Sequence, residues 1–221
     1  MTYPRLVQSE QLRLYMVTDD RLCHGRDLMD VVAQAVKGGV TCVQLREKQL
    51  PTRDFVTRAR ALKAFLTPLH IPLVINDRLD VALACDADGV HLGQSDMSAD
   101  MARRLLPPQM FIGLSVEKMQ DVAIATHLPV DYLGISPIFA TPTKTDTHSP
   151  WGLEGLRQVR SQTALPLVAI GGIHAGNAAD VVLAGADGLA VVSAICAAEA
   201  PAAAAEKLLA IASPHFKTVT R

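Results

Sequence analysis

Short apolar runs alternate with amphipathic segments along almost the whole chain. The runs are four to eight residues long, as buried strands are, and occupy residues 12–18, 41–46, 72–76, 89–92, 110–115, 132–139, 166–171 and 188–193. Each is followed by apolar positions at helical spacing, over residues 27–37, 52–66, 79–85, 99–106, 118–126, 154–161, 175–184 and 201–212. Strands that alternate with helices predict parallel pairing, and continuous apolar strands predict burial on both faces.

Eight strand–helix units predict a single closed (β/α)8 barrel, the TIM barrel, and 221 residues lie at the short end of its size range. The connections from a helix to the next strand also repeat. A glycine ends the helix and the strand begins in each of KGGV (37–40), ADGV (87–90) and ADGL (186–189). An open Rossmann or flavodoxin-like sheet would use five or six strands, and the dinucleotide-binding glycine pattern is absent from the sequence. We expect one domain over residues 1–221, with short tails at 1–11 and 213–221.

The composition is that of a soluble globular protein, with 49% apolar and 19% charged residues. Lysine and arginine (21) nearly balance aspartate and glutamate (22), so the charge favours neither nucleic acid nor a membrane as a partner. The first twenty residues lack the apolar core of a secretory signal, and the Ala-rich segment 197–212 is interrupted by charges and Pro201, as in an amphipathic helix. Four scattered cysteines are typical of reduced core thiols, so we expect a cytoplasmic protein.

Unusual polar residues and small-residue turns follow the predicted strands, where TIM barrels carry their chemistry. They are Arg46-Glu47-Lys48 at the end of strand two, Asn76-Asp77-Arg78 at the end of strand three, Gly93 to Asp96 at the end of strand four, Ser115 at the end of strand five, the loop 140–150 after strand six, Gly171-Gly172 at the end of strand seven and Val192-Ser193 at the end of strand eight. Any one of these could be a helix cap, a solvated rim or a tight turn. Their convergence on one end of the barrel favours a functional site.

The chemistry of these residue types indicates phosphate binding. Glycine-rich or small-residue turns after strands seven and eight commonly hold a phosphate on backbone N–H groups. Asp77 and Asp96 are hard oxygen ligands on neighbouring strands, suited to Mg2+ bound to a diphosphate. Arg46, Lys48 and Lys144 would neutralise the remaining oxygens. The pattern predicts two phosphorylated ligands, or one phosphorylated at both ends.

The histidines give little indication of function. His91 falls within a strand and is expected in the core or behind the site, whereas His24 and His174 fall in loops that could touch a ligand. We expect the other histidines at the surface; these are His70, His127, His148 and His215. Neither a Ser-His-Asp arrangement nor an H-E-x-x-H motif is visible in the sequence, so hydrolase functions gain no support.

Several of these motifs together resemble the thiamine-phosphate synthase family in order and spacing. They are QLREK (44–48), NDR (76–78), GVHLGQ with Asp96 (89–96), TPTK (141–144), AIGGI with Asn177 (169–177) and AGADG running on to VVSAI (184–195). The resemblance covers about residues 12–212. It implies a TIM barrel that joins hydroxymethylpyrimidine diphosphate to thiazole phosphate or its carboxylated form, a transferase reaction that yields thiamine phosphate and diphosphate.

The resemblance also implies residue roles. Those implied to hold the pyrimidine diphosphate are Gln44, Leu45, Arg46, Glu47, Lys48 and Asn76, with Ser115 near the pyrimidine and Lys144 on the diphosphate. Asp77 and Asp96 would ligate Mg2+. Those implied to bind the thiazole phosphate are Thr141, Pro142, Thr143, Gly172, Val192 and Ser193. In the family the diphosphate leaves first and the thiazole nitrogen captures the cation, so the site has to stabilise charge and needs no strong general base.

Two other functions on the same fold remain to be weighed. Thiazole tautomerases of this fold carry a histidine near the end of strand six, where this chain has Pro137, and tend to lose the metal carboxylates. A regulatory barrel that binds without turnover would not need the full set of cations and carboxylates. Two departures from the family pattern are small: Trp151 stands where a smaller residue is usual, and Gln49 where an acidic one often follows. A homo-oligomer is compatible with the sequence, and loop 140–150 is a candidate lid.

Overall fold

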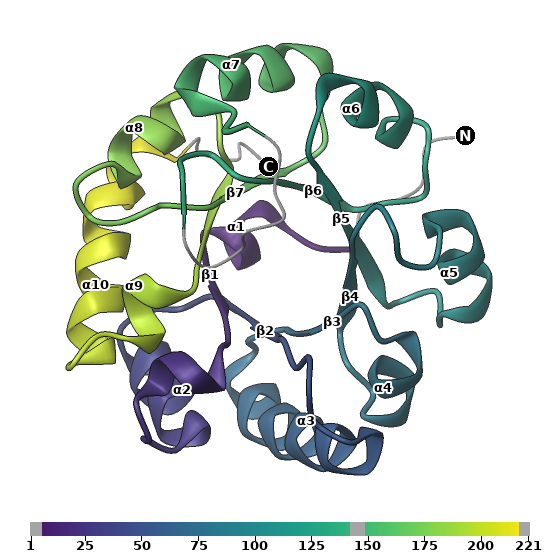
Figure 1. Ribbon diagram of the computed structural model, residues 1–221, viewed down its shortest axis with the longest axis vertical. Helices are drawn as coiled ribbons and strands as arrows, with labels where there is room; N and C mark the ends of the chain where they lie inside the picture. The colour runs from purple at the N-terminus through teal and green to yellow at the C-terminus, as the bar shows by residue number, and fades with distance from the viewer. Residues whose placement is uncertain (1–5, 142–148, 217–221) are drawn as a thin grey trace.

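The computed structural model describes residues 6–141 and 149–216, and its eight parallel strands close into a barrel in which each strand pairs with the next and β8 pairs with β1 (Figure 1). The strands are β1 (Leu14–Val17), β2 (Cys42–Leu45), β3 (Leu73–Asn76), β4 (Gly89–Leu92), β5 (Phe111–Val116), β6 (Tyr132–Ile135), β7 (Leu167–Ile170) and β8 (Gly188–Val191). The predicted TIM barrel is therefore confirmed, and the open sheet is excluded.

Most helices surround the barrel on the outside, and the first lies across one end of it (Figure 1). They are α1 (Ser9–Leu12), α2 (Leu28–Lys37), α3 (Thr52–Leu66), α4 (Leu79–Ala84), α5 (Ala99–Leu105), α6 (Met119–Ala125), α7 (Gly152–Gln162), α8 (Ala178–Leu183), α9 (Ser193–Cys196) and α10 (Pro201–Ala212), with short 3-10 turns η1 (Asp20–Cys23), η2 (Thr67–Leu69) and η3 (Ser213–His215). The sequence did not predict α1 or α9. Strand eight is shorter than expected because its last predicted residues, Val192 and Ser193, turn into α9.

Alternation along each strand separates two cores. In β1 the side chains of Leu14 and Met16 pack outward against the helices, whereas Tyr15 and Val17 point into the barrel. The same rule makes every second residue of a strand available to the barrel interior, because successive side chains point to opposite faces. Continuous apolar strands are thus explained, and the few inward polar residues become the ones that matter for function.

The N-terminal segment expected to be a tail is partly built into the barrel. Val7 and Leu12 are buried with the inward side chains of the strands, and the Leu6 N–H donates to Asp131 Oδ1 at 3.0 Å. At the other end of the chain Phe216 is nearly buried, with the Arg13 guanidinium carbon 5.5 Å from its ring centroid. These segments cover the apolar interior at the N-terminal ends of the strands, which would otherwise face water.

A repeated hydrogen bond joins the strands in pairs at this end. The residue that leads into each even-numbered strand accepts, on its side chain, the N–H of a residue in the preceding odd-numbered strand. The four pairs are Leu14 to Thr41 (3.0 Å), Leu73 to Asp88 (2.8 Å), Ile112 to Asp131 (2.8 Å) and Leu167 to Asp187 (2.9 Å). We call these four contacts the latches. They explain why ADG recurs at the joints, since the aspartate is the acceptor.

A cation from the helix that precedes the odd-numbered strand neutralises each of the three aspartate latches. Lys63 on α3 reaches Asp88 at 2.7 Å, Arg103 on α5 reaches Asp131 at 3.0 Å, and Arg160 on α7 reaches Asp187 at 2.8 Å. The aspartates therefore lie half-buried or buried without an uncompensated charge.

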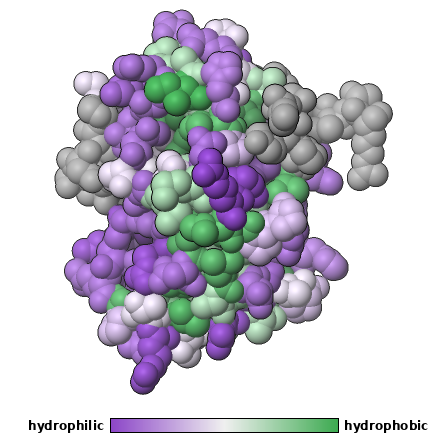
Figure 2. Space-filling model, turned by 90° about the vertical axis from the view of Figure 1, so that its right-hand side faces the viewer, coloured by the Kyte–Doolittle hydropathy of each residue, from purple (hydrophilic) through white to green (hydrophobic). Residues whose placement is uncertain are grey.

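One exposed surface feature is apolar. Figure 2 faces the side of the barrel that carries α5, and green apolar atoms gather there between polar ones. Met101 and Leu105 on α5 are exposed, as is Met97 just before the helix, and their spacing of four places them on one helix face. No helix within the described residues combines the length and the apolar character that a bilayer crossing requires.

All four cysteines are free and buried, which predicts slow reaction with thiol reagents. Burial raises the pKa of each thiol, and that of Cys196 to about 12, so the reactive thiolate is scarcer at pH 8 than in free cysteine. We expect the folded protein to react with Ellman's reagent at least about 100-fold more slowly than free cysteine. Four thiols should appear on unfolding in guanidinium. A thiol that reacts at the free rate without denaturant would contradict this burial.

Candidate functional site

A cavity of 520 Å³ opens at the C-terminal ends of the strands. One wall is charged and comes from β2, β3 and β4, and the opposite wall is made of small residues after β6, β7 and β8. Eleven of the residues predicted for the site line it; these are Gln44, Arg46, Lys48, Asn76, Asp77, Asp96, Ser115, Thr141, Gly172, Val192 and Ser193.

Two predicted residues do not line the cavity, because strand alternation turns them away. Leu45 is buried among the helix-facing side chains, and Glu47 bonds Arg58 Nη1 on α3 at 2.5 Å. Their neighbours Gln44, Arg46 and Lys48 point inward as the alternation requires. Three further predicted residues, Pro142, Thr143 and Lys144, lie outside the described residues, as does most of the candidate lid 140–150.

Two carboxylates meet on the charged wall. Asp96 accepts the Gly93 N–H at 2.7 Å, and Asp77 accepts Lys48 Nζ at 2.5 Å. Burial raises the pKa of Asp96, and the neighbouring Asp77 carboxylate raises it further. Two like charges held this close repel each other unless a proton or a cation lies nearby, and Lys48 supplies part of that compensation.

The backbone at Asp77 is strained in a way that fixes this carboxylate. Its φ of 62° lies in the left-handed region, which is uncommon for residues other than glycine. The turn is held by the Asp77 N–H to the His91 carbonyl at 2.9 Å and by the Arg78 N–H to the Asn76 carbonyl at 2.7 Å. Such strain persists only where surrounding contacts enforce it, and it clusters at functional positions.

The donor set fits Mg2+ that is shared with a ligand. Within the described ranges no three His, Cys, Asp or Glu side chains come together as a complete metal site. Mg2+, however, is commonly held by one or two carboxylates, with waters and substrate phosphate oxygens as its other ligands. Asp77 and Asp96 provide those two carboxylates on the cavity wall, so the residues present fit the ion.

The opposite wall depends on two consecutive glycines after β7. Gly171 and Gly172 have φ values of 104° and 65°, and Cβ atoms there would lie 2.8 Å from the Cβ atoms of Pro137 and Phe139 respectively. Both positions therefore require glycine for conformation and for space. The Asn177 side chain donates to the Gly172 carbonyl at 2.9 Å and secures the turn. Backbone rather than side chains thus forms the part of this wall that the two glycines make.

Five polar side chains cross the floor of the cavity in one hydrogen-bonded chain. Gln44 Nε2 donates to Tyr15 Oη at 2.9 Å, and the two phenol oxygens of Tyr15 and Tyr132 lie 2.9 Å apart. His91 continues the chain, with Nδ1 2.9 Å from Tyr132 Oη and Nε2 2.8 Å from Ser115 Oγ. Burial raises the pKa of both tyrosines well above the usual value, so they are neutral hydrogen-bonding groups near pH 7.

Sequence reasoning missed both tyrosines in this floor. Tyr15 and Tyr132 lie within apolar runs, and their only signal is that they occupy inward-facing positions. His91 was expected in the core or behind the site, but it is half-buried and lines the cavity as part of this floor. His24 and His174, which fall in loops that could touch a ligand, are exposed and do not line the cavity.

Comparison with known proteins gives a consistent result. The family model "Thiamine monophosphate synthase" matches residues 14–195. A thiamine-phosphate synthase of Albidiferax ferrireducens is 71% identical over 202 residues, covering 91% of this chain and 92% of that protein. One of Vibrio parahaemolyticus is 54% identical, covering 90% and 97%. The solved structure of a thiamine phosphate pyrophosphorylase from Pyrococcus furiosus superposes with a TM-score of 0.87 at 37% identity, covering 95% of this chain and 99% of that one.

Proposed function

The chain belongs to the thiamine monophosphate synthase family, and we propose that its cavity is where hydroxymethylpyrimidine diphosphate is joined to thiazole phosphate or its carboxylated form. The activity is a transfer of the pyrimidinylmethyl group that yields thiamine phosphate and diphosphate, with CO2 as a third product when the acceptor is the carboxylated thiazole. The observation that carries the assignment is one cavity with paired carboxylates and cations on one wall and a double-glycine turn on the other. This arrangement suits a diphosphate and a monophosphate held at once.

The charged wall would hold the diphosphate. Asp77 and Asp96 would bind Mg2+, which when present supplies positive charge to the departing diphosphate. Arg46 and Lys48 lie on the same wall and would contact the diphosphate oxygens, Arg46 through two parallel N–H groups and Lys48 as a point charge. Lys144, beyond the described residues, is proposed for the same diphosphate from the family resemblance alone.

The floor would receive the pyrimidine. Its ring nitrogens and amino group need donors and acceptors, which Gln44, Tyr15 and Ser115 offer through their hydrogen-bonded chain. Neutral phenols at this depth orient the ring without competing for the diphosphate charge. Asn76, on the wall above, would contact the pyrimidine or its diphosphate.

The reaction then needs position and charge more than proton transfer. The bond between the pyrimidine methylene carbon and the diphosphate oxygen breaks, and its electron pair leaves with the diphosphate. The lone pair of the thiazole nitrogen forms the new C–N bond to that carbon. Arg46 and Lys48 stabilise the charge that builds on the leaving group, and the walls keep the thiazole nitrogen in line. No side chain has to remove a proton.

The small-residue wall would bind the thiazole phosphate. Gly172, Val192 and Ser193 line this side with Thr141, so backbone N–H groups and two hydroxyls surround the space that a monophosphate would fill. Pro142 and Thr143 are proposed there from the resemblance and lie outside the described residues.

Replacing Gly172 with alanine is expected to raise the KM for thiazole phosphate by about tenfold or more, and the KM for pyrimidine diphosphate by less than about threefold. The added Cβ would meet Phe139 Cβ at 2.8 Å and displace the turn. Steady-state kinetics with each substrate varied measures this. Gly152→Ala is the matched control, because Gly152 also has a positive φ (61°) but open space around its Cβ position. Equal KM changes for both substrates would contradict the assignment of this wall.

The decisive assay mixes the protein with both substrates, with and without Mg2+, and follows diphosphate and thiamine phosphate together. Joint, Mg2+-dependent appearance of both products supports the proposal. Binding of both ligands without turnover would favour a regulatory barrel. Isomerisation of the thiazole without a new C–N bond would favour a tautomerase, which Pro137 at the end of β6 argues against.

Two further expectations stay predictions. A cytoplasmic location is supported by the four free buried thiols, which suit a reducing compartment. A homo-oligomer would be detected by sedimentation equilibrium.

A further inference from the structure

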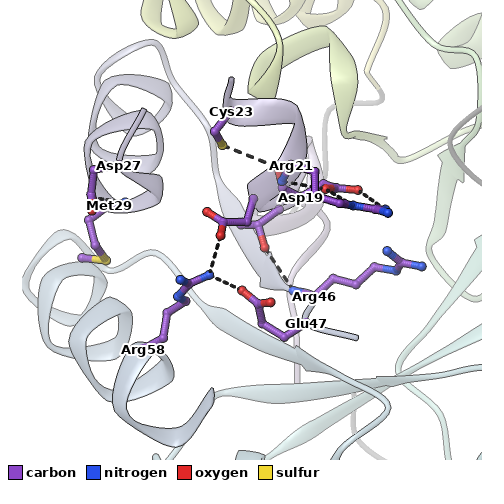
Figure 3. A network of polar contacts seen from close by, with 10 residues as sticks. Asp19, Arg21, Cys23, Asp27, Met29, Arg46, Glu47 and Arg58 are labelled. Carbon is purple, nitrogen blue, oxygen red and sulfur yellow. Dashed lines mark hydrogen bonds and ion pairs between the residues drawn. The ribbon is translucent and has the colours of Figure 1, made fainter. Parts of the chain in front are cut away.

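The connection between β1 and α2, residues 18–27, lies outside the cavity and contacts the segments that form its two walls. We call this segment the bracket. It contains η1, and it lies between the end of β2 and the short helix α9. Figure 3 shows it from close by, with Arg58 below it and Arg46 extending away toward the barrel.

One arm of the bracket holds α9. The Arg26 guanidinium donates to three backbone carbonyls: Nε to Cys23 at 2.9 Å, Nη1 to Ala198 at 2.6 Å and Nη2 to Cys196 at 2.6 Å. The last two lie at the C-terminal end of α9, where carbonyls lack helical partners and a cation is favourable. Ser193, at the opposite end of the same single turn, lines the cavity.

Because α9 has four residues, its two ends are only about 6 Å apart. A shift at its C-terminal end therefore moves Ser193 as well. The contact is reinforced by two buried thiols, since Cys196 Sγ bonds the Val17 carbonyl at 3.6 Å and Cys23 Sγ bonds the Asp19 carbonyl at 3.5 Å. Arg26 thus fixes the position of the wall proposed for the thiazole phosphate.

The other arm holds the end of β2. Thr18 Oγ1 accepts the Arg46 N–H at 3.1 Å. Arg58 Nη1 bonds Glu47 Oε1 at 2.5 Å and lies 3.4 Å from Asp20 Oδ2 (Figure 3). The Glu47 side chain is only 10% exposed, so its charge is held outward by this pair. With Glu47 fixed outward, alternation keeps Arg46 and Lys48 directed into the cavity.

From these contacts we propose that Arg26 and Arg58 are positioning residues for the two halves of the site: Arg26 for the thiazole phosphate wall, and Arg58 for the diphosphate wall. The inference rests on the proposed function. Neither residue is placed against a substrate, and each acts through one end of the bracket.

The test is steady-state kinetics on the full chain with each substrate varied in turn. Arg26→Ala is expected to raise the KM for thiazole phosphate about tenfold and to leave the KM for pyrimidine diphosphate within about twofold. Arg58→Ala is expected to raise the KM for pyrimidine diphosphate about tenfold and to leave the KM for thiazole phosphate within about twofold. Arg26→Lys and Arg58→Lys should each recover part of the loss, because an ammonium can reach some of the same acceptors but cannot reproduce the fork.

Arg160→Ala is the matched control. Arg160 is also largely buried, and it donates to the Asp187 carboxylate and to the Thr163 and Leu165 carbonyls. It lies, however, at the end of the barrel that carries the latches. Its loss should lower the melting temperature without changing either KM. If the alanine variants of Arg26 or Arg58 fail to fold, the lysine variants carry the same comparison.

The proposal would be overturned if the Arg26 and Arg58 variants changed the KM values for both substrates equally. It would also be overturned if these variants only lowered the melting temperature and left both KM values unchanged, as is expected of Arg160→Ala. Absence of turnover by the unsubstituted protein would count against the proposed function instead. In that case titration calorimetry would measure binding of each substrate to the Arg26 and Arg58 variants. Arg26→Ala should then weaken binding of thiazole phosphate, and Arg58→Ala binding of pyrimidine diphosphate. Equal losses of affinity for both substrates would also overturn the proposal.

Discussion

Asp96→Ala is expected to lower kcat by at least about 10³-fold while the protein stays folded. The substitution removes one of the two carboxylates proposed for Mg2+, so the diphosphate would leave without the full positive charge that stabilises it. The fold should tolerate the change, because burial and the facing Asp77 already disfavour a charged Asp96. Asp77→Ala should have the same effect, through loss of the other carboxylate.

Turnover measured against Mg2+ concentration, with melting temperature alongside, tests this expectation. Asp80→Ala serves as the control: Asp80 lies three residues beyond Asp77, is exposed, bonds Arg78 and does not line the cavity. It should keep near-normal turnover. Near-normal activity of Asp96→Ala at saturating Mg2+ would remove Asp96 from the metal site, and a collapsed melting temperature would assign it a structural role.

Asp131→Ala is expected to cost about 3–5 kcal/mol of unfolding free energy, the largest loss among the latches. Asp131 is 4% exposed. Its carboxylate accepts hydrogen bonds from the N–H groups of Leu6 and Ile112 and from Arg103 Nη2. Its removal leaves two N–H groups and a largely buried guanidinium without their acceptor. The loss should not affect the KM values, because the residue lies at the end of the barrel away from the cavity.

Urea unfolding of three latch variants provides an internal comparison. The exposed fraction of the aspartate side chain rises from 5% in Asp131 to 20% in Asp187 and 36% in Asp88. The loss of unfolding free energy should fall in that order, because solvent replaces the missing partner more easily at exposed positions. Glu206→Ala, at an exposed position on α10, should change it by less than about 0.5 kcal/mol. An order unrelated to exposure would contradict the account.

The sequence predicted the barrel well because its signal is repeated eight times. A single apolar run is ambiguous, but regular alternation with helices admits few topologies. The ends were less predictable. Val7 has no strand or helix pattern around it long enough to reveal that it fills the barrel interior, and Leu12, predicted to begin strand one, ends α1 instead.

The candidate site was predicted as contiguous motifs, and strand alternation divides those motifs. Residues 44–48 were grouped as one binding segment, whereas only the inward members line the cavity. Applying the two-residue period to this segment would have turned Leu45 and Glu47 outward from the sequence alone. The same parity would have drawn attention to Tyr15, which shares its face with Val17.

Other residues could not be found from the sequence. Arg26 bonds carbonyls 170 and 172 positions further along the chain, and no local pattern marks such a contact. Arg58 reads as an ordinary charged residue of α3, and its role depends on the side to which Glu47 turns. Positioning contacts of this kind emerge only once the barrel has closed.

The latches also bear on the order in which the barrel forms. They join residues only 27, 15, 19 and 20 positions apart, whereas closing the sheet pairs Leu14 with Leu189. Short loops cost little entropy to close, so each β-α-β unit can set its own register as soon as it has been synthesised. Four locally fixed quarters then remain to be joined, and the β1–β8 seam is left for last. The low contact order of these joints favours vectorial folding from the N-terminus, with misregistered strands avoided before the final closure.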